Sequence, residues 1–410
     1  MPEFLSLLPP TEALELFLSH LQANPLTQIT SVELALGRVT TAPVLAPHPL
    51  PEFPRSTVDG YAVRAADTFG ASEGLPAYLD LIGEVPMGDS PRFTVGPTQC
   101  ALIHTGGMVP KGADAVVMVE YTQSARLREI EVLRAAAVGE NIIQVGEDVQ
   151  VGEVVIPAGK RLRPAEIGGL MALGITKIEV AQKPRVGIIS SGDEVIPPKE
   201  QPQPGQVRDV NAYTLAALVQ QAGGQPVHYG IIPDNQEAMY EAAMQAKDEC
   251  DVVVITAGSS ASTRDLTSLV IDQLGEPGVL VHGVNVRPGK PTILAVCDGK
   301  AMVGLPGNPV SALVIAGLFV IPVIQTLSGE CISRPRPRVP AQLAINLPSQ
   351  AGREDWVPVK LVPGEGSYQA EPVFGRSNLI FTLAGADGLI CIPSDANGLA
   401  AGEMVDVYLL

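Results

Sequence analysis

In RVGIISSGDE, residues 185–194, an apolar run leads directly into a polar turn, and this segment is the strongest indication of the fold. A short apolar run of this kind, starting at 185–189, is typical of a buried strand in a parallel sheet. Similar apolar runs recur downstream and predict strands at 225–232, 251–256, 279–284, 292–296 and 301–303. Between and after them, apolar residues at helical spacing predict helices at 211–221, 235–247, 266–274 and from Pro309 onward. This alternation predicts β-α-β units and a doubly wound, mostly parallel α/β sheet.

The segments on either side are expected to form smaller modules. Upstream, apolar spacing predicts helices at 11–22, 31–39 and 164–173, and strands at 77–85, 101–104 and 115–119. Downstream, runs at 338–345, 356–361, 389–392 and 404–410 lack a helical period and predict a small β barrel or sandwich. We therefore expect four parts: a helical/β domain from two segments (1–45 with 147–183), a β-rich module (46–146), the α/β domain (184–328) and a C-terminal β barrel (329–410).

The charge balance argues against nucleic acid as the main partner. The 410 residues hold 27 Lys and Arg against 44 Asp and Glu, a formal charge of −17, with no run of five or six like positive charges. Nucleic-acid backbones are held largely by such cationic side chains. No membrane span is expected either, because the longest apolar stretch, 310–324, is shorter than the roughly 20 residues needed to cross a bilayer and reads as a buried helix.

The cysteines and the N-terminus indicate a cytoplasmic protein. The five cysteines are odd in number, widely spaced and never in a C-x-x-C pair, which favours reduced thiols. The first residues carry Glu3 and lack the positive charge of a signal peptide. The five histidines show no metal-ligand spacing, so a zinc site is not expected.

Loops that follow strands are where ligands bind in doubly wound sheets. In the first such loop, 190–194, small residues let the backbone approach a phosphate, and the carboxylate of Glu194 is placed to bind a cation. The second, 257–265, carries four hydroxyls and ends at Asp265, which suits an anion held at a helix N-terminus. For both loops, helix capping without any ligand is the alternative interpretation.

Two later loops and one upstream turn complete the candidates. In 287–291, two prolines and a glycine stiffen the backbone and hold two cations, Arg287 and Lys290, in an arrangement suited to an oxyanion, although a solvated charge pair on a turn is also compatible. The rigid loop 304–311 leads into the buried helix and suits a pocket wall. Upstream, Asp59 lies in a polar turn that feeds a strand, where it could bind a metal or simply form the turn.

In order and spacing these segments resemble the molybdopterin molybdenumtransferases, the MoeA family that includes the E domain of gephyrin. The motifs that carry the resemblance span essentially the whole chain: 58–62, 105–106, 110–114, 146–148, 191–194, 288–291 and 304–309. Any one of them could arise by chance, whereas their shared order and spacing are specific.

The resemblance implies an elongated four-part subunit in a homodimer, whose active site joins the α/β domain of one chain to the β module of the other. It implies that molybdate is inserted into adenylylated molybdopterin, with Mg²⁺-dependent cleavage of the adenylyl group to give the molybdenum cofactor and AMP. The α/β domain would then bind molybdopterin. The molybdopterin adenylyltransferase and molybdoenzymes are the further partners that this reaction suggests, and neither nucleic acid nor a membrane is among them.

The resemblance also assigns site residues. The positions important for activity in the family correspond to Asp59, Thr105, Asp148, Glu194, Asp234 and Asp265. Those that would bind molybdate and the pterin nucleotide correspond to Ser191, Gly192, Ser260, Arg287, Lys290, Pro306, Pro309, Arg353 and Ser377. Glu194 and Asp265 are expected to hold the Mg²⁺, since several carboxylates that face a phosphate repel it unless a cation lies between them.

Three positions depart from the family pattern. The loop 257–265 lacks a glycine pair and a second glycine that are common there. Arg287 is commonly a lysine, and its larger, bidentate guanidinium could alter the selectivity between molybdate and tungstate. The stretch 375–377 is less glycine-rich than in the family, which bears on Ser377.

Two other functions stay open on the sequence alone. A non-catalytic molybdopterin-binding scaffold would be expected to lose the carboxylate set, which is present here. A molybdopterin adenylyltransferase shares the doubly wound domain but needs only about 150 residues, a single domain's length. ATP consumption separates the two enzymes, because the adenylyltransferase uses ATP and the molybdenumtransferase does not.

Overall fold

The structure, a computed structural model, describes residues 7–257, 261–331, 335–364 and 366–410, with side chains for all of these except 261–265. Contacts divide the chain into two compact units. Unit 1 comprises Met1–Ala42, Ala158–Ile167 and Lys177–Leu410, and unit 2 comprises Pro43–Pro157 and Gly168–Thr176.

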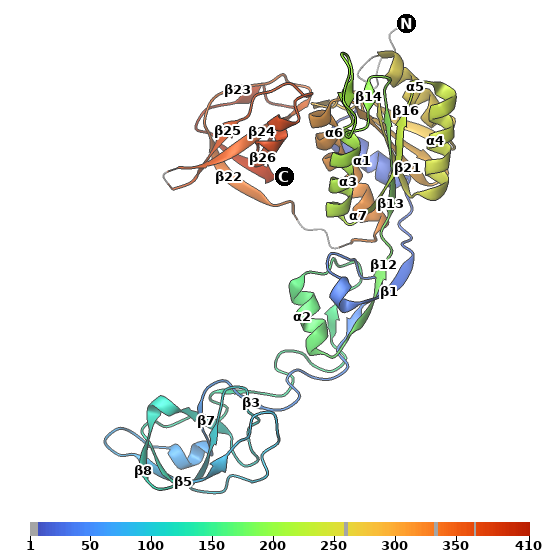
Figure 1. Ribbon diagram of the computed structural model, residues 1–410. Coiled ribbons are helices and arrows are strands. Elements are labelled where there is room, and N and C mark those ends of the chain that lie inside the picture. Colours follow the sequence, from blue (N-terminus) through green and yellow to red (C-terminus); the bar gives the residue numbers. More distant parts are fainter. Residues whose placement is uncertain (1–6, 258–260, 332–334, 365) are drawn as a thin grey trace. The chain divides into compact units, whose positions relative to one another are not determined.

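The centre of unit 1 is a six-stranded sheet in the order β16-β13-β17-β21-β20-β18 (Figure 1). The four parallel strands are β16 (Gln225–Ile232), β13 (Arg185–Ser191), β17 (Val252–Ala257) and β21 (Lys300–Pro306). The two antiparallel strands at one side are β20 (Ile293–Cys297) and β18 (Pro277–His282). The doubly wound, mostly parallel α/β sheet expected from the sequence is confirmed.

Helices cover both faces of this sheet (Figure 1). One face is covered by α1 (Pro10–Ser19), α3 (Asn211–Ala222), α6 (Pro309–Ile315) and α7 (Ile321–Leu327), and the other by α4 (Gln236–Glu249) and α5 (Ala261–Asp272). Successive side chains of β17 point to opposite faces of the sheet. Val252 and Val254 pack in the hydrophobic core on the first face, and Val253 and Ile255 pack in the core on the other. A strand buried on both faces must be apolar throughout, which is why its sequence shows no alternation.

The apolar stretch expected to form a buried helix does so. The continuous helix Pro309–Leu327 is long and apolar enough to cross a membrane by length and composition. Here it packs against the sheet, with Ala312, Phe319 and Val323 fully buried. A π-helical turn at Ala316–Val320 interrupts it just before Pro322, which lacks the N–H that the helix ladder requires.

The C-terminal strands of unit 1 close into a five-stranded barrel, as expected. They are β22 (Arg338–Leu343), β24 (Glu354–Pro363), β25 (Tyr368–Pro372), β26 (Gly388–Ile392) and β28 (Met404–Leu409). The order is β24-β25-β22-β28-β26, and β26 pairs back onto β24. A two-residue strand from the α/β domain segment, β19 (Val286–Arg287), adds to β24 in parallel, so the barrel sheet includes a strand that precedes β20 and β21 of the α/β sheet.

The helix expected at 31–39 is wrong. Residues Thr27–Ser31 form β1, which pairs antiparallel with β12 (Lys177–Ala181), and a single 3₁₀ turn, Val32–Leu34, follows. The apolar residues here do not share one helix face, because Val32 and Ala35 are buried whereas Leu34 and Leu36 are exposed. Gly37, with φ +73°, turns the chain, and Val39 and Thr40 then pair with Arg161 and Val180, so the expected helix does not form.

The four-part division of the chain stays a proposal. The pairing of β1 with β12 joins the two separated segments of its first part. Helix α1, from the same first segment, packs instead on the α/β sheet.

Unit 2 is built on a curled six-stranded sheet in the order β7-β4-β6-β5-β9-β8. Its strands are β4 (Gly60–Val63), β5 (Ala77–Glu84), β6 (Gln99–Ile103), β7 (Ala115–Met118), β8 (Thr122–Arg126) and β9 (Glu129–Val132), and they include the three expected at 77–85, 101–104 and 115–119. Gly60 lies so close to β7 that a Cβ there would be 1.9 Å from the carbonyl oxygen of Val117. The glycine after Asp59 is therefore required by strand packing. Helix α2 (Pro164–Ala172) matches the helix expected at 164–173.

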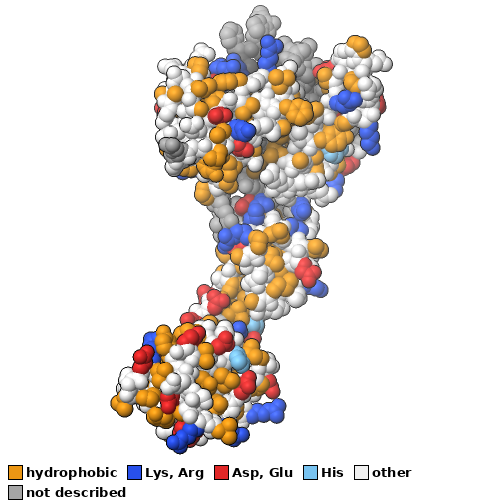
Figure 2. All heavy atoms as spheres, turned by 60° about the vertical axis from the view of Figure 1, so that its left-hand side comes forward, with side chains coloured by type: hydrophobic (Ala, Val, Ile, Leu, Met, Phe, Trp, Pro, Cys, Tyr) orange, Lys and Arg blue, Asp and Glu red, His pale blue; other side chains and the backbone are white. Residues whose placement is uncertain are grey.

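Both units carry mixed surface charge. On the face shown in Figure 2, acidic, basic and hydrophobic side chains are interspersed. This agrees with the interpretation of the −17 charge as unsuited to an extended nucleic-acid surface.

Candidate active site

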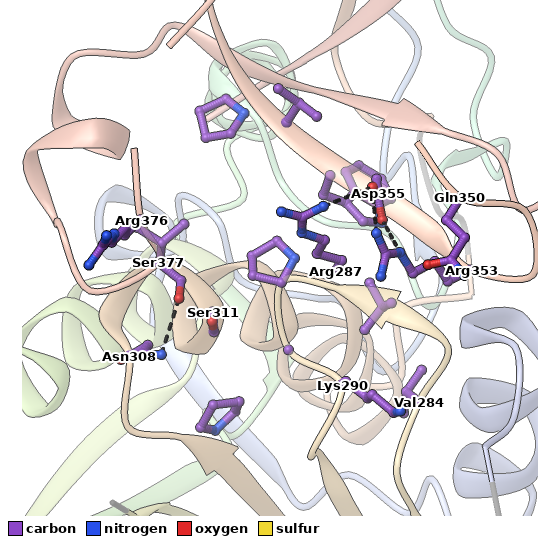
Figure 3. Close-up of a pocket in the computed structure, with 18 of the residues that line it drawn as sticks. Val284, Arg287, Lys290, Asn308, Ser311, Gln350, Arg353, Asp355, Arg376 and Ser377 are labelled. Carbon is purple, nitrogen blue, oxygen red and sulfur yellow. Dashed lines mark hydrogen bonds and ion pairs between the residues drawn. The ribbon is translucent and has the colours of Figure 1, made fainter. Parts of the chain in front are cut away.

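A cavity of about 1040 Å³ lies in unit 1 between the α/β domain and the barrel (Figure 3). Its walls come from the segments 284–291, 306–311, 347–358 and 373–382. Of the residues assigned from the sequence, it brings together Arg287, Lys290, Pro306, Arg353 and Ser377. Loops from two parts of the chain that are distant in sequence thus converge on one cationic cavity.

Strand pairing places two of these cations side by side. Arg287 in β19 lies directly opposite Asp355 in β24, so both side chains project from the same face of the ladder. Arg353 precedes Asp355 by two residues and shares that face. Arg353 Nε donates to Asp355 Oδ1 at 2.8 Å and Nη2 to Oδ2 at 3.4 Å, and Arg287 Nη1 lies 3.7 Å from Oδ2.

The loop 287–291 is stiff, as its composition predicted. Gly289 has φ +116°, and a Cβ there would lie 2.3 Å from Cγ1 of Ile315 on α6, so only glycine fits. Thr292 Oγ1 donates to the Gly289 carbonyl at 2.6 Å, and the Lys290 carbonyl accepts from Val284 N–H at 2.9 Å. The exposed Lys290 side chain therefore extends from a fixed backbone.

The opposite wall joins the loop 304–311 to the barrel. Asn308 Nδ2 donates to Ser377 Oγ at 3.1 Å (Figure 3). Val310 N–H donates to the Ser377 carbonyl at 3.0 Å. Pro309 occupies the first position of α6, where its missing N–H costs nothing; it does not line the cavity itself, whereas Pro306 does.

A second group of polar residues lies at the carboxyl ends of β13 and β16. Gly192 follows Ser191 with φ +138°, and a Cβ there would lie 2.7 Å from Glu194 Oε2. The N–H of Asp234 donates to Asp193 Oδ1 at 3.2 Å. Ser191, Gly192, Glu194 and Asp234 are therefore gathered at one edge of the sheet, but they do not line the cavity that holds Arg287.

This second group is short of positive charge. Partial burial, followed by the repulsion of Asp193 and Glu194, raises the pKa of Asp234. Asp234 Oδ1 is buried without a hydrogen-bond partner of normal geometry, and the nearby Ser191 hydroxyl opposes part of the rise in the pKa of Asp234. Among the described residues, none of these three carboxylates forms an ion pair with Lys or Arg.

Two assigned residues cannot be placed in this group. Ser260 and the side chain of Asp265 lie outside the described residues. Within the described part of the chain, no three His, Cys, Asp or Glu side chains are arranged to hold a metal ion. The assignment of Mg²⁺ to Glu194 and Asp265 therefore stays a prediction.

The remaining assigned residues belong to unit 2. Thr105 donates to Asp59 Oδ1 through its main-chain N–H at 2.8 Å and its hydroxyl at 3.3 Å. The N–H bond is the main cause of the lowered pKa of Asp59. The His104 ring lies between two carboxylates: Nδ1 is 3.6 Å from Asp59 Oδ1, and Nε2 is 2.9 Å from Glu84 Oε1. The hydrogen bond to Glu84 is the main cause of the raised pKa of His104.

Asp148 sits apart from that pair on a turn of unit 2. Its N–H donates to the Leu50 carbonyl at 3.0 Å, and its side chain is exposed. The structure thus brings Asp59 and Thr105 together, while Asp148 lies on a different turn.

Asp355 and Asn308 are among the cavity residues that the sequence did not single out as site residues. The alternation Arg353-x-Asp355 at the start of a strand would have placed both side chains on one face. No sequence signal pointed to the pairing of this strand with Val286–Arg287, because β19 has only two residues.

Family models match almost the whole chain. "MoeA N-terminal region (domain I and II)" matches residues 8–174, "Probable molybdopterin binding domain" matches 187–326, and "MoeA C-terminal region (domain IV)" matches 340–410.

Relatives of similar length support the same grouping. The molybdopterin molybdenumtransferase of Nostoc sp. is 33% identical, over 94% of this chain and 89% of its own, and that of Bacillus subtilis is 33% identical, over 95% and 91%. The crystal structure of the molybdopterin biosynthesis MoeA protein from Pyrococcus horikoshii OT3 is 34% identical, covers 99% of this chain and 100% of its own, and superposes with a TM-score of 0.86.

Proposed function

The chain belongs to the MoeA family of molybdopterin molybdenumtransferases, and from this premise we propose that it inserts molybdate into adenylylated molybdopterin and releases AMP and the molybdenum cofactor. The enzyme is a transferase. The scaffold and adenylyltransferase alternatives are not favoured, because relatives that match it over nearly their whole length are molybdenumtransferases.

The observation that carries this proposal is the cationic wall of the cavity in unit 1. Molybdate is a tetrahedral dianion, and it requires positive charges held in place before it arrives. Arg287, Lys290 and Arg353 supply these charges from a stiff loop and a strand end, and the Ser377 hydroxyl lines the same cavity. We assign the oxyanion to these four residues.

The second polar group fits a divalent cation. Asp193, Glu194 and Asp234 repel one another, and Asp234 Oδ1 is a buried oxygen without a partner. Mg²⁺ is usually held by one or two carboxylates together with substrate phosphates, so a complete protein cage is not needed. Glu194 and Asp265 would hold it, and Asp234, which follows the adjacent strand β16, lies close to Glu194. When bound there, Mg²⁺ would neutralise charge on the phosphates during cleavage.

The chain's own groups have separate roles in the proposed reaction. Ser191 and Gly192 would let the backbone approach the nucleotide phosphates, because the turn excludes a larger side chain at Gly192. Arg287, Lys290 and Arg353 would hold the oxyanion through their N–H donors. The rigid Pro306 would shape the cavity wall, and Pro309 would fix the start of helix α6 next to it.

We also propose a homodimer in which the site is completed by the β module of a second copy. Asp59 and Thr105 form a preformed, exposed pair in unit 2, with the carboxylate kept ionised by an N–H donor. Supplied by a second chain, this pair and Asp148 would face the nucleotide.

The compartment and the remaining partners belong to the same proposal. All five cysteines are free, which supports a reducing, cytoplasmic setting. The adenylyltransferase would supply the adenylylated substrate, and molybdoenzymes would accept the product.

AMP release tests the function. The purified enzyme with adenylylated molybdopterin, molybdate and Mg²⁺ should release AMP, measured by chromatography, and withholding molybdate or chelating Mg²⁺ should reduce release to background. Asp265→Asn should still bind the nucleotide and release none. Wild-type protein that binds the substrate yet yields no AMP would contradict the proposal, and ATP consumption with molybdopterin alone would indicate the adenylyltransferase instead.

A further inference from the structure

Asp355 is an unusual member of the cavity wall. Among the described residues that line the cavity it is the only acidic one, beside the cations Arg287, Lys290, Arg353 and Arg376. Its side chain is only 6% exposed. A buried carboxylate is tolerated only when cations or N–H donors compensate for the water it has lost.

The carboxylate orients two guanidiniums from different segments. Arg353 approaches it with Nε and Nη2, and Arg287 approaches with Nη1 (Figure 3). Of the five N–H donors of a guanidinium, Arg353 commits two to Asp355 and keeps three for another anion. Arg353 is thus held by one edge while its other edge is free to bind, and Arg287, at ion-pair distance without a hydrogen bond, is drawn toward the same carboxylate.

The backbone beneath this carboxylate is fixed on both sides. Asp355 pairs with Arg287 in β19 and with Ile392 in β26. The preceding N–H, of Glu354, donates to the Asn285 carbonyl at 3.0 Å. The carboxylate can therefore act as a rigid reference point for side chains that would otherwise sample many rotamers.

The same carboxylate adjusts the charge of the wall. Arg287, Lys290 and Arg353 with Asp355 leave a net charge of +2, equal and opposite to that of a dianion such as molybdate. Figure 3 shows Arg376 on the other side of the cavity, beside Ser377.

We propose that Asp355 is a positioning residue for the oxyanion: it aligns Arg287 and Arg353 and limits the charge they present. The inference rests on the proposed function, since molybdate is the ligand that the arginines would hold. Asp355 itself would not touch the substrate.

The barrel offers a matched control. Arg338 and Asp406 form another Arg–Asp pair on its strands, with Nη1 2.6 Å from Oδ2. Both side chains are largely exposed, and neither lines the cavity. Asp406→Asn therefore removes an equivalent ion pair without changing the oxyanion wall.

The test measures AMP release at varied molybdate, together with direct molybdate binding by calorimetry. Asp355→Asn should raise the molybdate KM by about 10- to 100-fold, as expected for displaced positioning groups, while kcat at saturating molybdate stays within about threefold. Calorimetry should show the same loss of affinity. Asp406→Asn should match wild type, and Asp355→Glu, which keeps the charge, should show a smaller rise in KM.

A double-mutant cycle checks that Asp355 acts through the arginines. In an Arg353→Lys background, Asp355→Asn should raise the molybdate KM by a much smaller factor than it does in the wild type. An unchanged molybdate KM, a fall in kcat alone or fully additive effects would overturn the proposal while leaving the enzymatic function intact. Absence of AMP release from the wild type would instead contradict the proposed function. If Asp355→Asn does not fold, a wild-type KM in Asp355→Glu overturns the inference and a raised one supports it.

Discussion

Two carboxylates of unit 1, Asp355 and Asp234, differ in how the protein compensates for the burial of their oxygens. Both have buried oxygens. Asp355 is paired with two arginines on the cavity wall, whereas Asp234 has an oxygen without a partner and two acidic neighbours, Asp193 and Glu194. The first arrangement is complete within the protein and leaves cationic edges free. The second is incomplete and suited to a cation from outside. A reaction between an oxyanion and a nucleotide whose phosphates bind a metal ion would use both.

The largest expected effect comes from breaking the complete pair. Arg353→Ala leaves the buried Asp355 with only the more distant Arg287, and we expect a loss of about 3 kcal/mol in the free energy of unfolding. Urea denaturation followed by tryptophan fluorescence measures this well, because Trp356 lies next to Asp355. Arg338→Ala, which breaks an exposed pair in the same barrel, should cost less than about 1 kcal/mol. Equal losses in the two variants would mean that burial does not set the strength of the Asp355 pair.

A smaller change in stability, in the opposite direction, is expected when the Asp234 carboxylate is removed. Its pKa is raised, so the folded state binds its proton more tightly than the unfolded state does. The stability linked to this group is fully present below the pKa of the unfolded chain and is lost as pH rises through the folded pKa. At pH 7 without Mg²⁺, Asp234→Asn should therefore raise Tm slightly, by up to about 2 °C.

Two conditions sharpen this prediction. The gain in Tm from Asp234→Asn should vanish at acidic pH, where wild-type Asp234 is itself neutral. It should also shrink or reverse when Mg²⁺ and nucleotide are present, because the cation then favours the ionised carboxylate. A lower Tm for the variant at pH 7 without Mg²⁺ would show that Asp234 is already compensated within the protein.

The smallest expected effect is a change in the pKa of Asp59, an exposed carboxylate that accepts hydrogen bonds from Thr105. Its pKa is lowered mainly by the Thr105 main-chain N–H, so its contribution to stability is present above the unfolded pKa and is lost as pH falls through the folded pKa. Thr105→Ala keeps this N–H and should leave most of the lowering, as read from the side-chain ¹³C chemical shift during titration. A return of the Asp59 pKa to its usual value in Thr105→Ala would show that the hydroxyl is the main cause.

Strand and helix positions in the α/β domain could be predicted because each follows from local patterns. Strands such as Gln225–Ile232 were placed correctly by their apolar runs, and helices such as Asn211–Ala222 by their spacing. The helix expected at 31–39 does not form, because Val39 and the adjoining Thr40 pair with Arg161 and Val180 much later in the chain, and no local window contains those partners.

The candidate site was predicted less evenly. The stiff loop around Arg287 and Lys290 was recognisable from its prolines and glycine, and the structure gives Gly289 a contact that only glycine permits. Arg353 was identified as a site residue only through the family resemblance, and Asp355 was not identified from the sequence. Both depend on the two-residue strand β19, too short to leave a periodic signal.

Local sequence patterns specify the doubly wound domain, the barrel strands and the chemical types of the ligand-binding loops, since apolar periodicity, prolines and glycines act over a few residues. Which charges meet depends on the three-dimensional fold. Asp355 is compensated and Asp234 is not because of pairings between segments far apart in the chain: Arg287 reaches Asp355 across a strand ladder, while Asp193 and Glu194 meet Asp234 at the ends of adjacent strands. Electrostatic energies depend on distance and burial in space, and neither is encoded in local sequence.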